Sequence, residues 1–188
     1  MKKYFSYLMI LSLFWSCFTK QIVKKTTLYD DSSNSFICCS GPEFESNRSH
    51  FMSQGIGESL DQSLSKKKAL SFARADLVQI LKTTLDSVLS SYLSSLNTDT
   101  QNILKDRFYG IQREVIKGVI NHTNVVCENL TKTASGKFKT YIAIEKSSIE
   151  LMNEFNSIVM TDLLLKECFE SREYEKYFFL EMKKLDTY

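Results

Sequence analysis

Two glycines, Gly55 and Gly57, precede a strongly helical stretch of the sequence, as glycines do in many nucleotide sites. In such sites a strand leads into a glycine-rich turn, and backbone N–H groups at the start of a helix bind phosphate. A dinucleotide fingerprint requires a third glycine where Leu60 stands, and the sequence also lacks the Gly-Lys-Ser or Gly-Lys-Thr of a P-loop. We therefore expect these glycines to bind no cofactor and to supply special backbone angles between a strand and a helix.

Cys17 is the second candidate for chemistry. It follows two lysines, an apolar run that ends at Trp15, and Ser16. This order is typical of a secretory signal, and the run is shorter than the roughly 20 residues that span a bilayer. A cysteine at this place resembles the acylated cysteine of a bacterial lipobox, which becomes the first residue of the mature chain. The alternative is an ordinary cleaved signal, or an uncleaved anchor, with an incidental cysteine. We expect Cys17 to carry a lipid anchor that holds the protein on a membrane.

Four further cysteines are Cys38, Cys39, Cys127 and Cys168. They form no C-x-x-C pair and have no histidine at metal-ligand spacing, so we expect no metal site. Adjacent cysteines rarely bond to each other. The preferred interpretation is therefore that these residues are unpaired thiols. One disulfide from Cys127 to Cys38 or Cys39 is the alternative in an oxidising envelope.

No set of catalytic residues emerges from the rest of the sequence. The two histidines, His50 and His122, accompany no nucleophile motif, and Glu114, Glu128 and Glu145 lack a spacing suited to acid–base catalysis. The net charge of +2, from 24 basic and 22 acidic residues, is too balanced for a dedicated nucleic-acid binder. We expect neither an enzyme nor a nucleic-acid partner.

The elements that position these residues follow from hydrophobic periodicity. With one proline and six glycines the chain favours long helices. We predict a strand over 50–56 and a long amphipathic helix over 59–96 that opens with a capping box at Ser59. At its full length this helix either projects or breaks, near Ser90-Ser91 or Ser94-Ser95. Ala69, Ala73 and Ala75 are small enough to let it lie close to the sheet.

The second half of the chain alternates helix, hairpin and helix. We predict a helix over 98–117, ended by Gly118, and a hairpin of strands within 119–132 and 136–146, with its loop at 133–137. A third helix begins near Ser147, and its apolar stripe includes Leu163. The tail from Phe169 onward is helical in character, and we expect it to pack back on the domain.

These elements together resemble a known family, the small bacterial lipoproteins typified by the twenty-kilodalton Helicobacter membrane-associated lipoprotein. The likeness covers about residues 37–146, from a turn segment through GIGES and KKKALSFARADLVQIL to a hairpin. The residues that match the family pattern are Gly55, Gly57, Ser59, Ala69, Ala73, Arg74 and Ala75. The resemblance implies an α+β domain with helices packed on a small antiparallel sheet. It also implies an outer-membrane lipoprotein without an assigned biochemical role.

The predicted organisation is a lipoprotein signal peptide (1–16), a flexible tether (17–36), the α+β domain (37–146) and a C-terminal helical extension (147–188). The fold class is α+β, with about three antiparallel strands packed against long helices. We expect a non-enzymatic, lipid-anchored protein of the bacterial envelope that binds a protein partner or scaffolds an assembly. The sequence is compatible with either side of the membrane. The alternative is a small-molecule or lipid carrier whose pocket, between sheet and helices, is lined by Phe72, Phe108 and Phe138.

Overall fold

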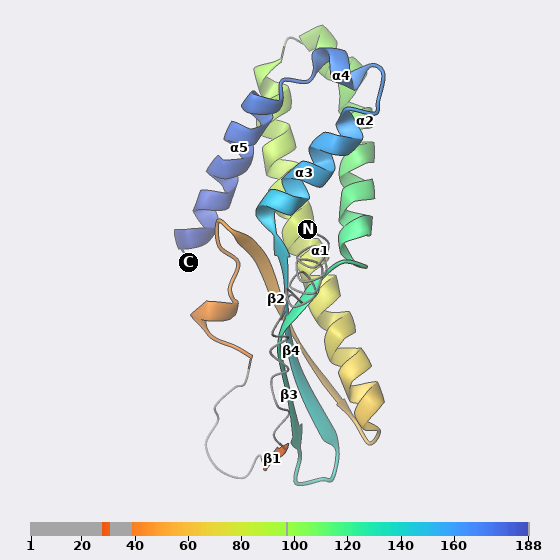
Figure 1. The fold of residues 1–188 in the computed structure, drawn as a ribbon, viewed down its shortest axis with the longest axis vertical. Coiled ribbons are helices and arrows are strands. Elements are labelled where there is room, and N and C mark those ends of the chain that lie inside the picture. Colours follow the sequence, from red (N-terminus) through yellow and green to blue (C-terminus); the bar gives the residue numbers. More distant parts are fainter. Residues whose placement is uncertain (1–27, 31–38, 97, 188) are drawn as a thin grey trace, which may run out of the picture.

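The computed structural model describes residues 28–30, 39–96 and 98–187 (Figure 1). Cys17 and Cys38 therefore lie outside the described residues. The strands are β1 (Leu28–Asp30), β2 (His50–Ser59), β3 (Asn124–Lys132) and β4 (Phe138–Ser147). The helices are α1 (Gln62–Ser95), α2 (Thr98–Val119), α3 (Ser148–Val159), α4 (Leu165–Cys168) and α5 (Ser171–Lys184), with short 3₁₀ turns η2 (Pro42–Phe44) and η3 (Leu185–Thr187).

Three antiparallel strands in the order β3-β4-β2 form the body of the sheet, and β1 pairs in parallel with the outer edge of β3. The β3–β4 hairpin turns at the predicted place, where Gly136 takes a positive φ of 78°. The long helix α1 crosses one face of the sheet, and its far half is surrounded by α2, α3 and α5 (Figure 1). The fold is α+β, as predicted, with a small sheet packed against long helices.

Gly55 and Gly57 lie inside the regular strand β2, so the prediction that they supply special backbone angles is wrong. Among the described glycines only Gly41 and Gly136 have a positive φ. What Gly55 provides is the absence of a side chain. A Cβ on Gly55 would lie 2.1 Å from the carbonyl oxygen of Ala69, and one on Gly57 would lie 2.2 Å from that of Ser65. The backbone of α1 therefore lies directly on the backbone of β2.

Small and hydroxylated side chains complete this close contact. Ala69 and Ala73 are fully buried against the sheet, as their size led us to expect. The Ser53 hydroxyl donates to the carbonyl of Ala73 at 2.7 Å, and the hydroxyls of Ser65 and Thr140 form a hydrogen bond at 2.7 Å. These bonds satisfy the polar groups that such a close approach buries.

The start of α1 differs from the prediction. Strand β2 continues to Ser59, which pairs with Phe138 of β4, so the predicted capping box at Ser59 is wrong. Asp61 is the N-cap instead, and its carboxylate accepts from the N–H of Leu64 at 2.7 Å. From there α1 runs unbroken for 34 residues, about 51 Å at 1.5 Å per residue. It neither breaks nor projects, because the half beyond the sheet packs in the helical bundle.

An aromatic cluster fills the bundle end of the core. Its members come from α1, α2, α3, α5 and the turn before α5, and they are Tyr92, Phe108, Phe155, Phe169 and Tyr174. The rings of Phe155 and Tyr174 stack at 4.5 Å, and the Tyr92 hydroxyl accepts from the N–H of Glu170. Phe178 of α5 is also fully buried, so the tail packs back on the domain as predicted. Leu163 does not continue the stripe of α3, because the helix ends at Val159 and Leu163 is 73% exposed.

The opposite face of the sheet is covered by the segment before β2. Cys39 and Cys127 form a disulfide with their Cα atoms 5.5 Å apart, so the preferred interpretation of these two residues as unpaired thiols is wrong. Cys39, Tyr141 and Ala143 form a small second core on this face. Cys168 is an exposed free thiol. Both faces of β4 are therefore buried. For this reason the alternating residues of β4 do not divide into a solvent-exposed face and a core face.

Candidate functional site

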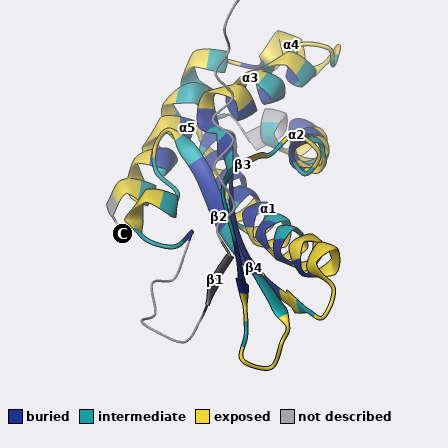
Figure 2. Cartoon of the chain, turned by 60° about the horizontal axis from the view of Figure 1, so that its bottom comes forward, coloured by how far each residue is buried: buried dark blue, intermediate teal, exposed yellow. Residues whose placement is uncertain are grey.

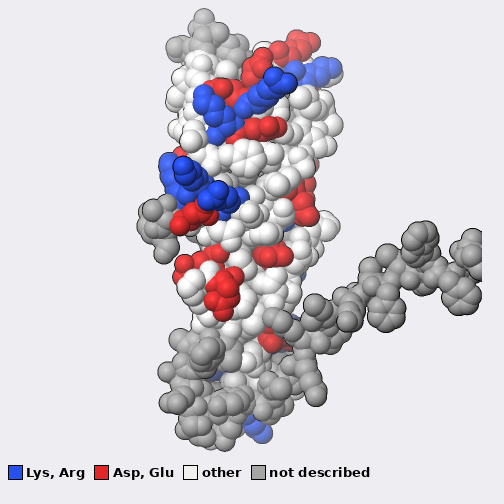
Figure 3. Space-filling view, turned by 60° about the vertical axis from the view of Figure 1, so that its left-hand side comes forward, with Lys and Arg blue, Asp and Glu red and all other residues white. Residues whose placement is uncertain are grey.

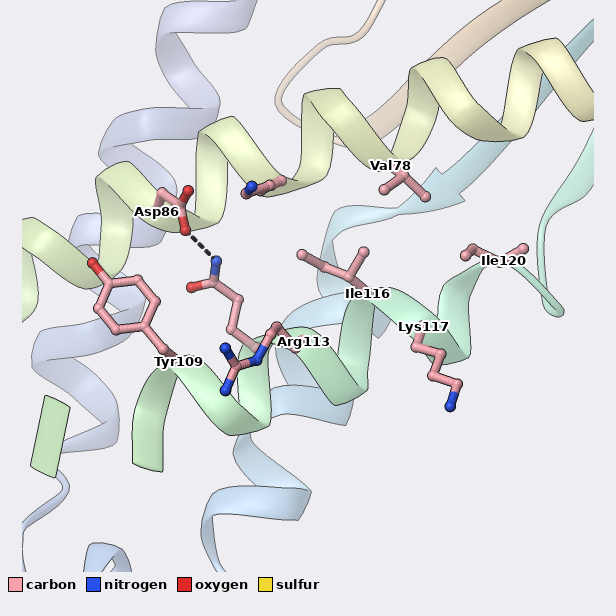
Figure 4. Close-up of a pocket in the computed structure, with 9 residues that line it drawn as sticks. Val78, Asp86, Tyr109, Arg113, Ile116, Lys117 and Ile120 are labelled. Carbon is pink, nitrogen blue, oxygen red and sulfur yellow. Dashed lines mark hydrogen bonds between the residues drawn. The ribbon is translucent and has the colours of Figure 1, made fainter. Parts of the chain in front are cut away.

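Helices α1 and α2 each have buried residues toward the core and exposed residues on the outer side (Figure 2). An open cleft of about 470 Å³ lies between these two helices (Figure 4). From α1 it is lined by Val78, Lys82 and Asp86. From α2 and the residue after it, the lining is Tyr109, Gln112, Arg113, Ile116, Lys117 and Ile120. Figure 4 shows Val78 and Ile116 pointing toward each other across the cleft, with Arg113 and Lys117 projecting from α2.

A second hollow of about 610 Å³ continues this cleft toward the start of α1. The two share Val78 and Ile120. The hollow adds Lys67, Leu70, Ser71, Arg74 and Ala75 of α1 to the lining. We call the combined surface the α1–α2 groove.

The groove exists because both helices carry apolar residues beyond the face that packs in the core. Phe108, Ile111 and Val115 of α2 point into the core, and Ile116 extends the apolar surface toward the outer side. On α1, Ala73 and Leu77 face the sheet and bundle, whereas Val78 is only half-buried at the groove. The floor of the groove is therefore apolar, and it consists of Leu70, Val78, Tyr109, Ile116 and Ile120.

The rim of the groove is cationic. Five basic residues line it, Lys67, Arg74 and Lys82 from α1 and Arg113 and Lys117 from α2. Asp86 is the only acidic residue in the lining. None of the five cations makes an ion pair with an acidic residue in the described part of the chain. Because both walls carry the same sign of charge, the groove attracts an anionic group along its length.

Two polar atoms at the groove are buried without a hydrogen-bond partner among the described residues, Gln112 Oε1 and Arg74 Nε. Gln112 is only 3% exposed, and its Nε2 donates to the carboxylate of Asp86 across the helix pair (Figure 4). Buried polar atoms in native proteins almost always have a partner. Both residues line the groove, although these two atoms are themselves shielded from solvent.

The lining of the groove contains no cysteine or histidine, and its one carboxylate is engaged by Gln112. His50 opens β2 and His122 lies exposed after α2, where its ring bonds to the carbonyl of Gly118. Among the described residues, no three His, Cys, Asp or Glu side chains are grouped so that they could hold a metal ion.

Other charged surfaces of the protein have a different character. Figure 3 turns the α5 side of the molecule forward and shows acidic and basic side chains next to one another. Glu173 pairs with Lys176 and Glu181 with Lys184 along α5. Opposite charges that alternate in this way stabilise a solvated helix only weakly. They give α5 no net preference for an anionic partner.

The structure brings together part of the predicted family motif. Gly55, Gly57, Ala69 and Ala73 meet at the contact of α1 with β2. Three other members do not join them. Ser59 ends β2, whereas Arg74 and the exposed Ala75 lie at the α1–α2 groove. Cys17, the predicted lipidation site, lies outside the described residues.

The three phenylalanines predicted to line the pocket of the carrier alternative are not brought together. Phe108 is fully buried in the aromatic cluster, Phe72 is 60% exposed on α1, and Phe138 lies at the hairpin beside Lys132. The three side chains do not line a common cavity among the described residues. The α1–α2 cleft lies between two helices, and a separate hollow of about 580 Å³ lies between the start of α1 and strands β3 and β4, where Lys66, Glu128 and Thr140 line it.

Sequence reasoning did not find the groove. The available signal was a set of apolar residues next to the core stripes, each with a lysine or arginine within four residues, namely Leu70 and Val78 on α1 and Ile116 and Ile120 near the end of α2. That pattern indicates a helix with two apolar faces, but it does not show which face is covered.

Comparisons with known proteins found no relative of this chain. No protein-family model, no curated protein and no solved structure matches the chain. The resemblance to the small bacterial lipoproteins therefore stays a prediction. In the described part of the chain, none of the helices combines the length and the apolar character needed to cross a bilayer.

Proposed function

We propose that this chain is a non-enzymatic, lipid-anchored protein of the bacterial envelope that binds a protein partner through the α1–α2 groove. One observation carries the proposal. The groove is an apolar surface with five cations on its rim and two buried polar atoms that lack partners among the described residues. Grooves with an apolar floor between helices are common docking sites for a segment of another protein.

The anchoring part of the proposal rests on the signal-like N-terminus and on Cys17. Acylation of Cys17 would place the folded domain close to a membrane, where a partner in the same membrane meets it at high effective concentration. Metabolic labelling with a clickable fatty-acid analogue tests this part. We expect label on the wild type and none on Cys17→Ala. Equal labelling of the two proteins would show that Cys17 does not carry a lipid anchor.

The groove part of the proposal is tested by photo-cross-linking in the native cell. A photoreactive residue replaces Val78 or Ile116 in the groove, and a matched one replaces Leu180, which is 51% exposed on α5. We expect one dominant protein adduct from the two groove positions and none from Leu180. The adduct should disappear when Arg113 and Lys117 are both changed to glutamate in the same protein. Adducts as abundant from Leu180 as from the groove would contradict the proposal.

A further inference from the structure

We propose that the occupant of the α1–α2 groove is an acidic amphipathic helix of the partner protein. This inference rests on the proposed function, in which the groove is a docking site. It adds the chemical class of the partner and the orientation of its charges. Three features of the groove support it, namely its shape, its charge and its buried polar atoms.

The shape of the groove matches a third helix. Two helices packed side by side leave a groove on each side of their contact, and a helix is the element whose ridges fit such a groove. On the inner side, the bundle of this chain covers the pair with α3 and α5. The outer side is open. From Leu70 to Asp86 it extends along α1 for about 24 Å at 1.5 Å per residue, the length of a helix of about four turns, and α2 forms the second wall over the part from Val78 to Asp86.

The charge of the groove selects an acidic helix. Lys67, Arg74 and Lys82 stand on the α1 wall, and Arg113 and Lys117 stand on the α2 wall. A helix that lays its apolar face on the floor presents its two flanks to these walls. Aspartate or glutamate on both flanks would meet cations, and lysine or arginine there would meet like charges, which disfavour binding. Both flanks of the occupant are therefore acidic.

The buried polar atoms add a finer requirement. Oε1 of Gln112 accepts no hydrogen bond from the described residues, and Asp86 beside it is already engaged by the Nε2 of Gln112. If the Gln112 side chain turns so that Oε1 faces the groove, an occupant that carries a serine, asparagine or glutamine at this point of its apolar face would donate the missing bond. Such a residue gives the complex a fixed register, because a donor at any other position would be buried against apolar side chains.

Two other occupants fit these observations less well. A second copy of this chain would bring its own cationic groove face to face with the first, and like charges would oppose each other along both walls. A fatty-acid carboxylate shares the apolar and anionic character of the acidic helix, but a single headgroup would meet only one part of a rim whose cations stand on both walls. Both occupants are kept as outcomes of the test.

The test uses two designed peptides of about 16 residues, or about 24 Å of helix. Both carry the same leucine stripe with one central asparagine, and their flanks are all glutamate in one and all lysine in the other. Each is titrated by calorimetry into the full chain held in nanodiscs of neutral lipid. We expect the acidic peptide to bind at least about tenfold more tightly than the basic one, which corresponds to a few weak ion pairs acting together. This preference should shrink as salt is raised from about 50 to about 500 mM.

Matched variants locate the effect. The double change Arg113→Glu and Lys117→Glu should reverse the preference between the two peptides. The control, Lys176→Glu with Lys184→Glu, makes the same change of charge on α5 and should leave both affinities within about twofold. Circular dichroism checks that each variant is folded. Gln112→Leu should weaken the peptide with the central asparagine relative to one with leucine there.

The outcomes separate this inference from the proposed function. Equal affinity for the two peptides, or a preference that Arg113→Glu with Lys117→Glu does not change, overturns the acidic helix. Binding of dodecanoate without binding of either peptide points to a carrier, and a dimer that the double variant alters points to a second copy. If groove positions such as Ile116 still cross-link to one partner in cells, the proposed function survives this failure. If they do not, both proposals fall.

Discussion

Gly55→Ala is the substitution for which the structure makes the sharpest prediction. The added Cβ would lie 2.1 Å from the carbonyl oxygen of Ala69 and 2.6 Å from the backbone nitrogen of Ala73. Ordinary carbon–oxygen contacts begin near about 3.4 Å, so α1 must withdraw from β2 by on the order of 1 Å. Overpacking of this kind costs about 1–3 kcal/mol. We expect the upper end of this range, because the obstacle is helix backbone and not the end of a flexible side chain.

The assay is thermal or urea unfolding of the full chain, followed by circular dichroism. For a protein of this size a loss of about 3 kcal/mol lowers Tm by roughly 6–12 °C. Gly110→Ala is the matched control. Gly110 lies inside α2, and a Cβ there meets nothing within 4 Å. The control should therefore stabilise the protein, by up to about 1 kcal/mol from helix propensity.

A second substitution tests which atom of residue 69 obstructs the added Cβ. In the background of Gly55→Ala, the change Ala69→Gly should restore no stability, because the atom in the way is the backbone oxygen of residue 69 and not its side chain. Unfolding of Gly55→Ala at the same temperature as wild type would contradict the close backbone contact of α1 with β2. So would a Gly110→Ala variant that loses as much stability as Gly55→Ala.

Three further predictions concern stability and pH. Cys127→Ser, or reduction of the disulfide that closes 88 residues of chain, should lower the free energy of unfolding by about 2–4 kcal/mol, measured in urea with and without reductant. The N–H of Leu165, and then Arg107, hold the pKa of Asp162 below its usual value, so its stabilising effect is present above about pH 4 and is lost as pH falls through the folded pKa. Asp162→Ala should therefore flatten the acid limb of the curve of stability against pH. Burial raises the pKa of Tyr174, so this phenol should stay neutral above pH 10 until alkali unfolds the protein, which tyrosinate absorbance would report. Early ionisation of all the tyrosines while circular dichroism stays native would contradict that burial.

The contact of α1 with β2 shows how far sequence reasoning reaches. The small side chains of Ala69 and Ala73 correctly predicted a close approach of helix and sheet, whereas Ala75, of the same predicted set, is exposed at the groove. The role given to Gly55 was wrong, because sequence does not distinguish a glycine needed for its φ from one needed for its missing Cβ. Ser59 was taken as the cap because it precedes the helical period. Pairing of β2 with β4, a tertiary effect, extends the strand to Ser59 and leaves Asp61 to cap the helix.

Residues far apart in sequence account for what could not be predicted. Cys127 had two adjacent candidates for a partner, and only the path of the chain before β2 brings Cys39 beside it. The α1–α2 groove depends on which side of the helix pair α3 and α5 cover. Val78 and Ile116 look like ordinary core residues until that choice is made. The sequence shows that α1 and α2 carry more apolar residues than the core face alone needs. Only the packing of the folded chain shows which of these residues form the floor of the open groove.

Methyl NMR shows residue by residue whether an acidic helix binds in the α1–α2 groove. The full chain is labelled at its isoleucine methyl groups in neutral nanodiscs, and the acidic peptide is added. Ile116 and Ile120 report on the groove, whereas Ile56 on β2 and Ile149 on α3 are 45% and 56% exposed elsewhere. We expect the methyl resonances of Ile116 and Ile120 to shift until they saturate with peptide. The methyl resonances of Ile56 and Ile149 should not move. Shifts centred on Ile56 or Ile149, or no shift at any isoleucine, would contradict binding of the acidic helix in the groove.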